Sequence, residues 1–262
     1  MNAAGRYDQH MPSLSVVIPC KDDAGPVTRC LEALAAQTVA PLEVIVVDNN
    51  STDSSAEIAA QLGARVLTEP VPGIAAAASA GYDAALGSII VRCDADTLPP
   101  TDWLQRIANR FDTEPDLAVL TGPGNFYDAG PLRAWLANLA YMQAYFVSMG
   151  LAMAHWPPFG SNCAFRRADW ESVRSRIHRL DPEVHDDVDF GFALAPSRRT
   201  AYDRSLKVGI SARSLAGGTA GRRRFRRAFH TLALHWRVAP PWERWAWTLH
   251  QNRERRRRAL SS

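Results

Sequence analysis

The chain contains the run Ile89-Ile90-Val91-Arg92-Cys93-Asp94-Ala95-Asp96-Thr97, in which apolar residues pass almost directly into two carboxylates. A continuous apolar run of about five or six residues is typical of a strand that is buried on both faces. In an open α/β sheet, the groups that handle a ligand lie just beyond the carboxyl ends of such strands. Two carboxylates one residue apart repel each other, and a hard divalent cation bound through carboxylates and substrate phosphates relieves that repulsion. We therefore expect a ligand site directly after this strand.

Strands and helices alternate on both sides of this run. Short β-rich runs predict further strands at residues 14–18, 42–47 and 64–67, and Pro19 is expected to end the first of them. Apolar residues at helical spacing predict helices at residues 26–36, 54–62, 74–86 and 101–111. Repeated β-α units of this length form parallel strands joined by right-handed crossovers. The predicted fold class is α/β, with a Rossmann-like, mostly parallel central sheet flanked by helices.

The composition excludes several classes of protein. A chain of 262 residues that is 47% hydrophobic has ample core for one large domain or two small ones. Its four cysteines lie far apart without a Cys-x-x-Cys pair, and its histidines show no paired spacing, which argues against a disulfide framework and a zinc site and fits a reducing cytoplasm. Residues 1–12 lack the apolar segment of a signal peptide, so we expect a cytoplasmic protein. Neither a Gly-x-Gly-x-x-Gly motif nor a Gly-Lys-Ser/Thr loop follows the first strand, which disfavours dinucleotide-binding proteins and NTPases.

The charge of the chain is unevenly distributed. The formal net charge is +3, but residues 217–262 contain twelve arginines and two glutamates and so carry about ten net positive charges. The rest of the chain is therefore acidic by about seven charges. A basic extension on an acidic body indicates contact with a polyanion or a membrane surface.

The C-terminal segment, residues 216–262, is predicted to form a basic amphipathic helical extension that is divided at Pro240-Pro241. Its aromatic and apolar residues recur at helical spacing: Phe225, Phe229, Leu232 and Trp236 before the prolines, and Trp242, Trp245 and Leu249 after them. Such helices suit the headgroup region of an anionic membrane, which would make the protein peripheral at the inner face of the membrane. The alternative is a helix packed on the body with a solvated basic face. Nucleic acid is the least favoured partner, because the body contains no nucleic-acid-binding module.

A second predicted strand also ends in an acid. Asp48 follows residues 42–47 and should lie at the same edge of the sheet as Asp94 and Asp96. Taken alone, Asp48 is typical of a turn or capping residue. Together the three acids indicate one crevice that suits a nucleoside diphosphate, with a carboxylate for base or ribose hydroxyls and a metal ion for the phosphates.

The order and spacing of several motifs resemble those of the family-2 glycosyltransferases. The matching segments are Ser15-Val16-Val17-Ile18-Pro19, Glu43-Val44-Ile45-Val46-Val47-Asp48 with Ser51-Thr52-Asp53, Gly73 through Gly81, Cys93-Asp94-Ala95-Asp96-Thr97-Leu98-Pro99, Gly160-Ser161-Asn162-Cys163-Ala164-Phe165-Arg166-Arg167 and Asp186-Asp187-Val188-Asp189-Phe190. They span roughly residues 12–215. The resemblance implies a GT-A catalytic domain over residues 12–215, followed by the basic extension at 216–262.

The resemblance also implies a set of donor-binding residues: Pro19, Asp23, Asp48, Gly73 and Asp94. Pro19 and Asp23 are expected to flank the nucleotide, and Asp48 to contact the base. Asp94 is expected to bind the ribose or the sugar, in the company of the loop at Gly73. The donor implied is a nucleotide-diphospho-sugar.

The resemblance implies an inverting transfer of the sugar to an acceptor hydroxyl. Asp96 is expected to ligate Mn²⁺ or Mg²⁺, which would neutralise the charge that develops on the departing diphosphate. Asp187 matches the general base of the family, and a carboxylate within hydrogen-bond reach can take the proton of the attacking hydroxyl. Asp186 and Asp187 also fit a helix N-terminus, where acids are favoured, and the two interpretations are compatible. The acceptor can be a glycan, a lipid or a small molecule.

Departures from the family pattern keep other functions open. The loop that begins at Gly73 has Ala78 and Ser79 where the family usually carries Arg-Asn, which is compatible with an inactive relative that binds a nucleotide-sugar or a membrane. A nucleotidyltransferase is a further alternative, but the residues after the first strand lack the Gly-rich basic loop expected of that class. The absence of a Gln-x-x-Arg-Trp motif and of several membrane spans favours a single-transfer enzyme. One candidate span, residues 134–156, contains polar groups and is predicted to be a buried helix.

Overall fold

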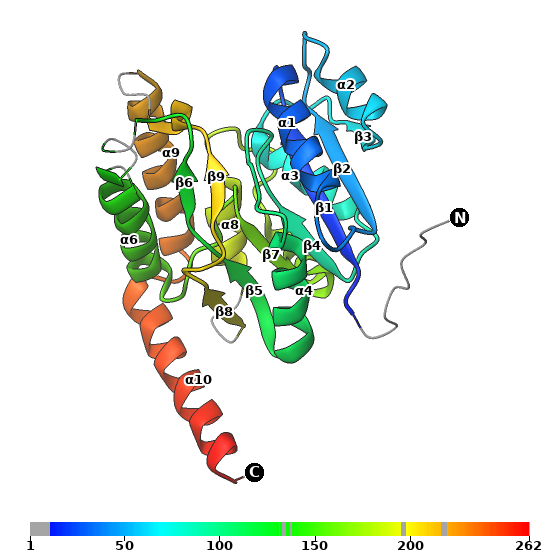
Figure 1. Ribbon diagram of the computed structural model, residues 1–262. Helices are drawn as coiled ribbons and strands as arrows, with labels where there is room; N and C mark the ends of the chain where they lie inside the picture. The colour runs from blue at the N-terminus through cyan, green and yellow to red at the C-terminus, as the bar shows by residue number, and fades with distance from the viewer. Residues whose placement is uncertain are drawn as a thin grey trace.

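The computed structural model of the chain describes residues 11–130, 132, 135–136, 138–194, 198–215 and 219–261 (Figure 1). Most of the N-terminal stretch in which the sequence predicts no signal peptide, residues 1–10, lies outside this set. Residues 216–218, where the C-terminal extension is predicted to begin, and Ala134, where the candidate span begins, also lie outside it. The division of the chain at residue 215 stays a prediction.

Strands and helices alternate through the first half of the described chain, close to the positions that the sequence predicts. The strands are β1 (Leu14–Cys20), β2 (Glu43–Asp48), β3 (Arg65–Thr68), β4 (Ile89–Arg92), β5 (Leu117–Thr121), β6 (Gly124–Phe126), β7 (Cys163–Arg166), β8 (Arg199–Tyr202) and β9 (Val208–Ile210). The α-helices are α1 (Ala24–Ala35), α2 (Ser55–Gln61), α3 (Ile74–Ala84), α4 (Trp103–Thr113), α6 (Gln143–Met153), α7 (Arg167–Val173), α8 (Asp186–Ala193), α9 (Thr219–Trp236) and α10 (Pro241–Ser261). A π-helical turn, η1 (Asn138–Met142), and two 3₁₀ turns, η2 (Arg174–Arg176) and η3 (Ala212–Leu215), complete the described elements.

The central sheet has seven strands in the order β3-β2-β1-β4-β7-β5-β8, and β7 runs antiparallel to both of its neighbours. Strands β6 and β9 pair in parallel as a separate two-stranded sheet. Helices α1, α2 and α4 pack on one face of the central sheet, and α3, α7 and α8 pack on the other. The strand order reverses at β1, because β2 and β3 lie on one side of it and β4 lies on the other. The predicted α/β class with a mostly parallel sheet flanked by helices is confirmed, and the reversal marks where a ligand crevice is expected.

Pro19 opens the sheet at this point of reversal. Strand β1 continues along β2 as far as the pair Cys20 and Asp48, so the expectation that Pro19 ends the strand is wrong on that side. On the β4 side the pairing stops at Val17, whose carbonyl accepts the Cys93 N–H at 3.3 Å. The next amide to donate toward β4 would be that of residue 19, and proline has none. The missing hydrogen bond lets β1 and β4 separate at their carboxyl ends.

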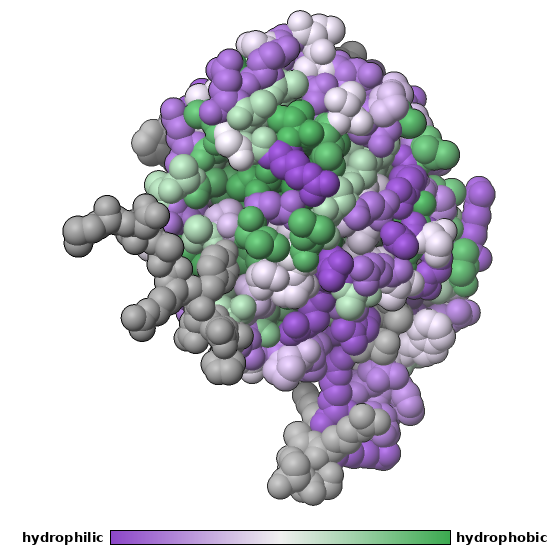
Figure 2. Space-filling view, turned by 90° about the vertical axis from the view of Figure 1, so that its right-hand side faces the viewer, coloured by the Kyte–Doolittle hydropathy of each residue, from purple (hydrophilic) through white to green (hydrophobic). Residues whose placement is uncertain are grey.

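The basic extension packs on the body through its first half. In α9, Leu232 is buried in a cluster with Val188 and Phe192 of α8. In α10, the buried Arg244 donates from Nε to the Met153 carbonyl at 3.0 Å and lies 4.7 Å from the centre of the Phe192 ring. Its burial lowers the pKa of Arg244 to about 10. The rest of α10 extends away from the body (Figure 1), and Figure 2 shows this projecting end as mostly hydrophilic.

The candidate span does not form a membrane helix in the part of the chain that the structure describes. Its described residues include η1 and α6. In α6, Phe146, Ala152 and Met153 are buried, but Val147 and Leu151 are more than half exposed, so the expectation of a buried helix is wrong for the outer face of α6. No helix made of described residues is both long enough and apolar enough to cross a bilayer. The four cysteines, Cys20, Cys30, Cys93 and Cys163, are all buried and unpaired.

Helix α3 lies against the sheet, where Ala77 and Ala78 pack in the same cluster as Val17 and Val47. A Cβ atom built on Gly81 would lie 2.9 Å from Cγ2 of Val47 and closer still to Cγ1 of Val17. Both neighbours are stiff β-branched side chains of the buried sheet, so they have little freedom to move aside.

We expect the substitution Gly81→Ala to destabilise the protein. Overpacking of a buried contact costs about 1–3 kcal/mol, which exceeds the gain of up to about 1 kcal/mol that alanine has over glycine inside a helix. Urea unfolding measures the free energy of unfolding. The matched control is Gly25→Ala in α1, where a Cβ would meet nothing nearer than Arg29 Nη1 at 4.0 Å and stability should be unchanged or higher. Equal stability of Gly81→Ala and the wild type would contradict the close approach of α3.

Candidate functional site

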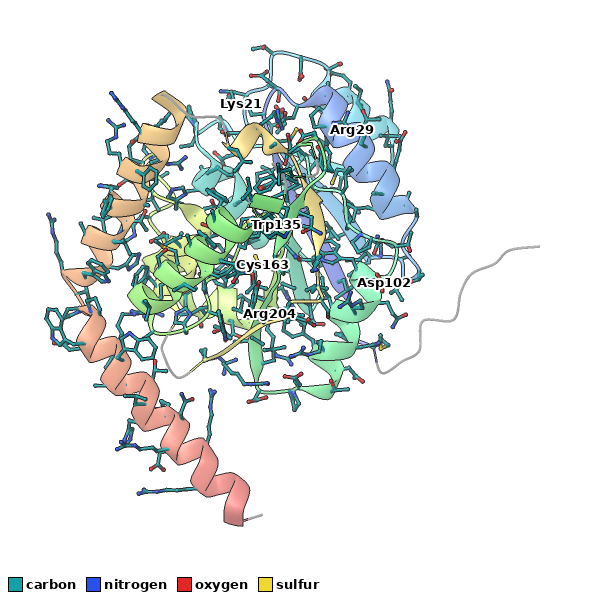
Figure 3. All side chains as sticks on the ribbon, turned by 60° about the vertical axis from the view of Figure 1, so that its left-hand side comes forward. Lys21, Arg29, Asp102, Trp135, Cys163 and Arg204 are labelled. Carbon is teal, nitrogen blue, oxygen red and sulfur yellow. The ribbon has the colours of Figure 1, made fainter. Side chains whose placement is uncertain are left out.

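A cavity of about 970 Å³ lies where β1 and β4 separate, and we call it the switch-point cavity. Five of the seven residues that the sequence singles out line it: Pro19, Asp23, Gly73, Asp94 and Asp96. Lys21, labelled at the top of Figure 3, belongs to the same lining, at the carboxyl edge of the sheet. The predicted crevice at this edge therefore exists, and most of the predicted residues meet in it.

Two carboxylates of the switch-point cavity share one cation. Arg213, in the turn η3, donates from Nη1 to Asp23 Oδ1 at 2.6 Å and from Nη2 to Asp96 Oδ2 at 2.8 Å. Burial and the nearby charge of Asp94 raise the pKa of Asp96, whereas Arg213 opposes that shift. The acids thus form a site of negative potential that a cation already occupies.

Asp94 is held by a buried arginine from its own strand. Arg92, at the end of β4, has 1% of its side chain exposed and contacts Asp94 Oδ1 at 2.6 Å through Nη1. The same nitrogen donates to the Gly160 carbonyl at 2.7 Å, and Nη2 lies 3.3 Å from Asp186 Oδ2 at the start of α8. Ser161 Oγ donates to the other oxygen of Asp94 at 2.5 Å. Burial favours the neutral form of Asp94, but Arg92 and Ser161 outweigh it and hold its pKa below the ordinary value.

Asp187 lies in the first turn of α8, as the sequence predicts for a helix N-terminus. Its Oδ1 accepts the Val188 N–H at 2.8 Å, and its Oδ2 accepts the Gly160 N–H at 2.9 Å and the Tyr145 hydroxyl at 3.4 Å. Burial, followed by the charge of Asp186, raises the pKa of Asp187. Asp187 is not among the residues that line the switch-point cavity, but Gly160 joins it to the group around Arg92 and Asp94.

Asp48 lies beside the switch-point cavity and outside its lining. It is buried at the end of β2, where its Oδ1 accepts the Ser51 N–H at 3.3 Å. The next residue, Asn49, lines the cavity and accepts the Gly73 N–H at 2.8 Å. Gly73 has φ +130° and ψ 144°, a conformation that is essentially restricted to glycine. Asn49 therefore fixes the loop that enters α3, a role that the sequence does not predict.

The switch-point cavity also has a basic wall that the sequence does not predict, formed by Lys21, His185, Arg213, Arg223 and Arg227. Arg223 and Arg227 belong to α9, in the extension whose charges the sequence assigns to a membrane or to solvent. Arg223 pairs with Glu183 at 3.2 Å, and Arg227 donates to the Val184 carbonyl at 2.6 Å. The signal that could have identified them is their spacing of four residues, which puts them on the helix face opposite Phe225 and Phe229.

This architecture defines a class of protein. A mostly parallel sheet with acids at its switch point is the arrangement of an α/β protein that binds a ligand at the carboxyl ends of its strands. The chain belongs to glycosyl transferase family 2, because residues 15–172 match the model of that family. The family predicted from the motifs is confirmed.

The curated relatives match part of the chain. An uncharacterized glycosyltransferase of Mycobacterium tuberculosis is 37% identical over 107 residues, which is 41% of this chain and 47% of the relative. Glycosyltransferase AglE of Haloferax volcanii is 34% identical over 104 residues, covering 37% of this chain and 34% of the relative. The chain thus matches about half, or less, of the length of these relatives.

Solved structures share the fold over most of the chain. The mannosyltransferase PcManGT from Pyrobaculum calidifontis, in complex with GDP-Man and Mn²⁺, aligns with a TM-score of 0.63 and 23% identity over 93% of this chain and 70% of that protein. Glucosyl-3-phosphoglycerate synthase from Mycobacterium tuberculosis, in complex with Mn²⁺, UDP-glucose and phosphoglyceric acid, aligns with a TM-score of 0.58 and 19% identity over 85% of this chain and 80% of that protein. Both likenesses support the GT-A fold.

Proposed function

We propose that the protein is a metal-dependent glycosyltransferase that moves a sugar from a nucleotide-diphospho-sugar to an acceptor hydroxyl with inversion. The observation that carries the proposal is that Arg92 joins Asp94 to Asp186 at the start of α8. Through Gly160, this group also includes the candidate base Asp187, so the acid proposed to bind the donor and the proposed base are connected. The solved GT-A proteins that hold GDP-Man or UDP-glucose with Mn²⁺ support the choice of donor and metal. In this proposal Pro19, Asp23, Asp48 and Gly73 surround the nucleotide.

The residues present fit a divalent cation. Asp96 and Asp23 already share the guanidinium of Arg213, and the raised pKa of Asp96 reflects its burial beside the charge of Asp94. Carboxylate oxygens are the ligands that Mg²⁺ and Mn²⁺ prefer. Asp96 would hold the ion, which when bound supplies positive charge to the departing diphosphate.

The chain's own residues supply the proton transfer and the positioning. In this proposal Asp187 accepts the proton of the acceptor hydroxyl as that oxygen attacks the anomeric carbon. The N–H groups of Gly160 and Val188 orient its carboxylate, and Tyr145 supports the same oxygen as Gly160. Attack from the face opposite the leaving diphosphate inverts the anomeric centre. Asp94 positions the sugar or ribose, since Arg92 and Ser161 fix both of its oxygens.

Two substitutions should separate the base from the metal ligand. We expect Asp187→Asn to lower the transfer rate by about 10²–10⁴-fold, the usual worth of a general base, with donor affinity changed less than twofold. We expect Asp96→Ala to lower the transfer rate and also to weaken donor binding at least tenfold. Calorimetric titration with UDP, GDP and dTDP, each with Mn²⁺ and with EDTA, measures binding and identifies the nucleotide.

The matched control is Asp102→Asn. Asp102 is an exposed acid at the start of α4 and does not line the cavity, so this substitution should leave the transfer rate and the donor affinity unchanged. Equal loss of donor affinity in Asp187→Asn and Asp96→Ala would contradict the two separate roles. Failure of every nucleotide to bind would instead favour an inactive relative. Release of diphosphate from a nucleoside triphosphate would favour a nucleotidyltransferase.

The acid limb of the pH–rate profile should report Asp187. A base acts as its carboxylate, so the rate falls as the pH drops through its pKa, and burial beside Asp186 moves that pKa upward. Removing the charge in Asp186→Asn should shift the acid limb of kcat to lower pH. An acid limb that stays in place in Asp186→Asn would mean that a group other than Asp187 controls it.

We further propose that the extension holds the protein peripherally on an anionic membrane surface, which would face the cytoplasm. Phe225 and Phe229 of α9 are 70% and 67% exposed, and Trp242 and Trp247 of α10 are 71% and 60% exposed. Helices α9 and α10 both adjoin α6, since Trp236 donates to the Ala152 carbonyl and Trp245 to the Leu151 carbonyl. Exposed aromatic side chains among arginines suit a headgroup region.

Vesicle co-sedimentation tests this contact. The wild type should bind vesicles that contain phosphatidylglycerol more strongly than pure phosphatidylcholine, since the arginines attract anionic lipid. The double variant Trp242→Ser, Trp247→Ser should bind at least tenfold more weakly. Leu86→Ser is the control, because Leu86 is 65% exposed on the loop between α3 and β4. Equal binding of both vesicle types, or no effect of the tryptophan variant, would contradict the membrane contact.

A further inference from the structure

Two histidines and an aspartate meet where α9 crosses the start of α8. His178 Nδ1 lies 2.8 Å from Asp189 Oδ1, and His235 Nε2 lies 2.7 Å from the same oxygen. The three ligand atoms all lie within 4.8 Å of one another. Asp189 is fully buried, whereas the side chain of His178 is 41% exposed, so solvent reaches one side of the group. Asp189 follows Asp187 by two residues, which places it on roughly the opposite side of α8.

We propose that His178, Asp189 and His235 form a zinc-binding site that fastens α9 to the body of the protein. Two imidazole nitrogens and one carboxylate oxygen are a ligand set that Zn²⁺ uses, with a water molecule in the fourth position. Zn–N and Zn–O bonds of about 2.0–2.2 Å at tetrahedral angles separate ligand atoms by ~3.3 Å. The present separations of 2.7 and 2.8 Å from the shared oxygen are shorter than this, so both imidazoles would have to move away from Asp189 Oδ1 to admit the ion.

The surroundings hold these ligands in orientation. Asp189 Oδ2 accepts the His178 backbone N–H at 2.8 Å, which fixes the carboxylate against the loop before α8. The His235 ring stacks on Phe192 with a centroid distance of 4.6 Å and an interplanar angle of 7°, and the Arg244 guanidinium lies 4.7 Å from the centre of that Phe192 ring. Partners that orient a ligand and shield it from water are a regular part of metal sites, and their loss typically weakens metal binding 10–100-fold.

Solvent reaches the site on the side of His178, whose side chain is 41% exposed. A water molecule could therefore complete the coordination from that side.

A zinc ion at this site would also affect the switch-point cavity. Helix α9 carries Arg223 and Arg227, which line that cavity, and it is joined to the body through His235. A second contact, between His230 Nε2 and Asp181 Oδ2 at 2.7 Å, lies one turn earlier on α9 and involves a different pair of residues. A zinc ion at His178, Asp189 and His235 would therefore fix the helix that supplies two of the cavity's arginines.

Sequence spacing predicts no zinc site, because the three ligands are spread over 58 residues, from 178 to 235, without a local motif. They come from a loop, from α8 and from α9, and only the packing of α9 on α8 brings them together.

Zinc binding to the untagged full chain tests the site. After treatment with EDTA and dialysis, the wild type should take up one Zn²⁺ per chain, measured by elemental analysis and by calorimetric titration with zinc alone. Co²⁺ in place of zinc should give the visible absorption of a tetrahedral N/O site. Zinc should also raise the Tm, because a ligand that binds only the folded state stabilises it.

Four variants at three positions distinguish the site from its surroundings. His178→Ala, at a side chain that is 41% exposed, should lose at least 100-fold in zinc affinity together with the zinc-dependent rise in Tm, and His178→Cys should recover part of both. His230→Ala is the matched control, because it removes a histidine of α9 that bonds Asp181 instead of Asp189. Asp96→Ala should retain the zinc, which separates this site from the proposed catalytic metal.

Two results would overturn the zinc site. One is the absence of stoichiometric uptake by the wild type, and the other is unchanged zinc affinity in His178→Ala. Because these measurements need neither donor nor acceptor, their outcome is independent of whether the protein transfers a sugar.

Discussion

The site depends on the ion pairs that the buried guanidinium of Arg92 forms with Asp94 and Asp186. This guanidinium lies at the end of β4 between the two acids, and it also binds the carbonyl of Gly160. Without it, two carboxylates would face each other in a poorly solvated environment, and breaking a buried ion pair in this way costs about 3–5 kcal/mol. Because Gly160 in turn holds Asp187, one cation joins the end of the sheet to the start of α8. The edge of the fold and the candidate base therefore form a single unit.

Much of the fold could be predicted from the sequence, because its signals are local. The run that ends in Asp94 is buried and apolar, as parallel strands are, and the alanines of α3 report a helix that lies against a sheet. Pro19 was harder to interpret, because its effect depends on which neighbour it faces. It leaves the β2 ladder intact and ends the β4 ladder, and a one-dimensional pattern does not say which strand lies on which side.

The site was predictable where a residue follows directly after a strand, as Asp94 and Asp96 do. It was not predictable where distant segments meet. Arg213 reaches Asp23 across 190 residues, and Arg223 and Arg227 belong to a helix whose charges also suit a membrane or solvent. For such residues the sequence does not indicate which side chains will be their neighbours. Those neighbours depend on how the turn η3 and helix α9 pack on the body.

If Asp96 holds the metal ion as proposed, the position of Arg213 makes the cavity a site of ion exchange. A divalent ion that approaches Asp96 meets a carboxylate already paired with a guanidinium, so it gains only the difference between the two pairings. A diphosphate that arrives with the ion offers the displaced guanidinium a new partner. Each of the two ligands therefore favours the other, and by thermodynamic linkage the factor is the same in both directions. Metal and nucleotide would bind cooperatively even though no part of the fold has to change shape.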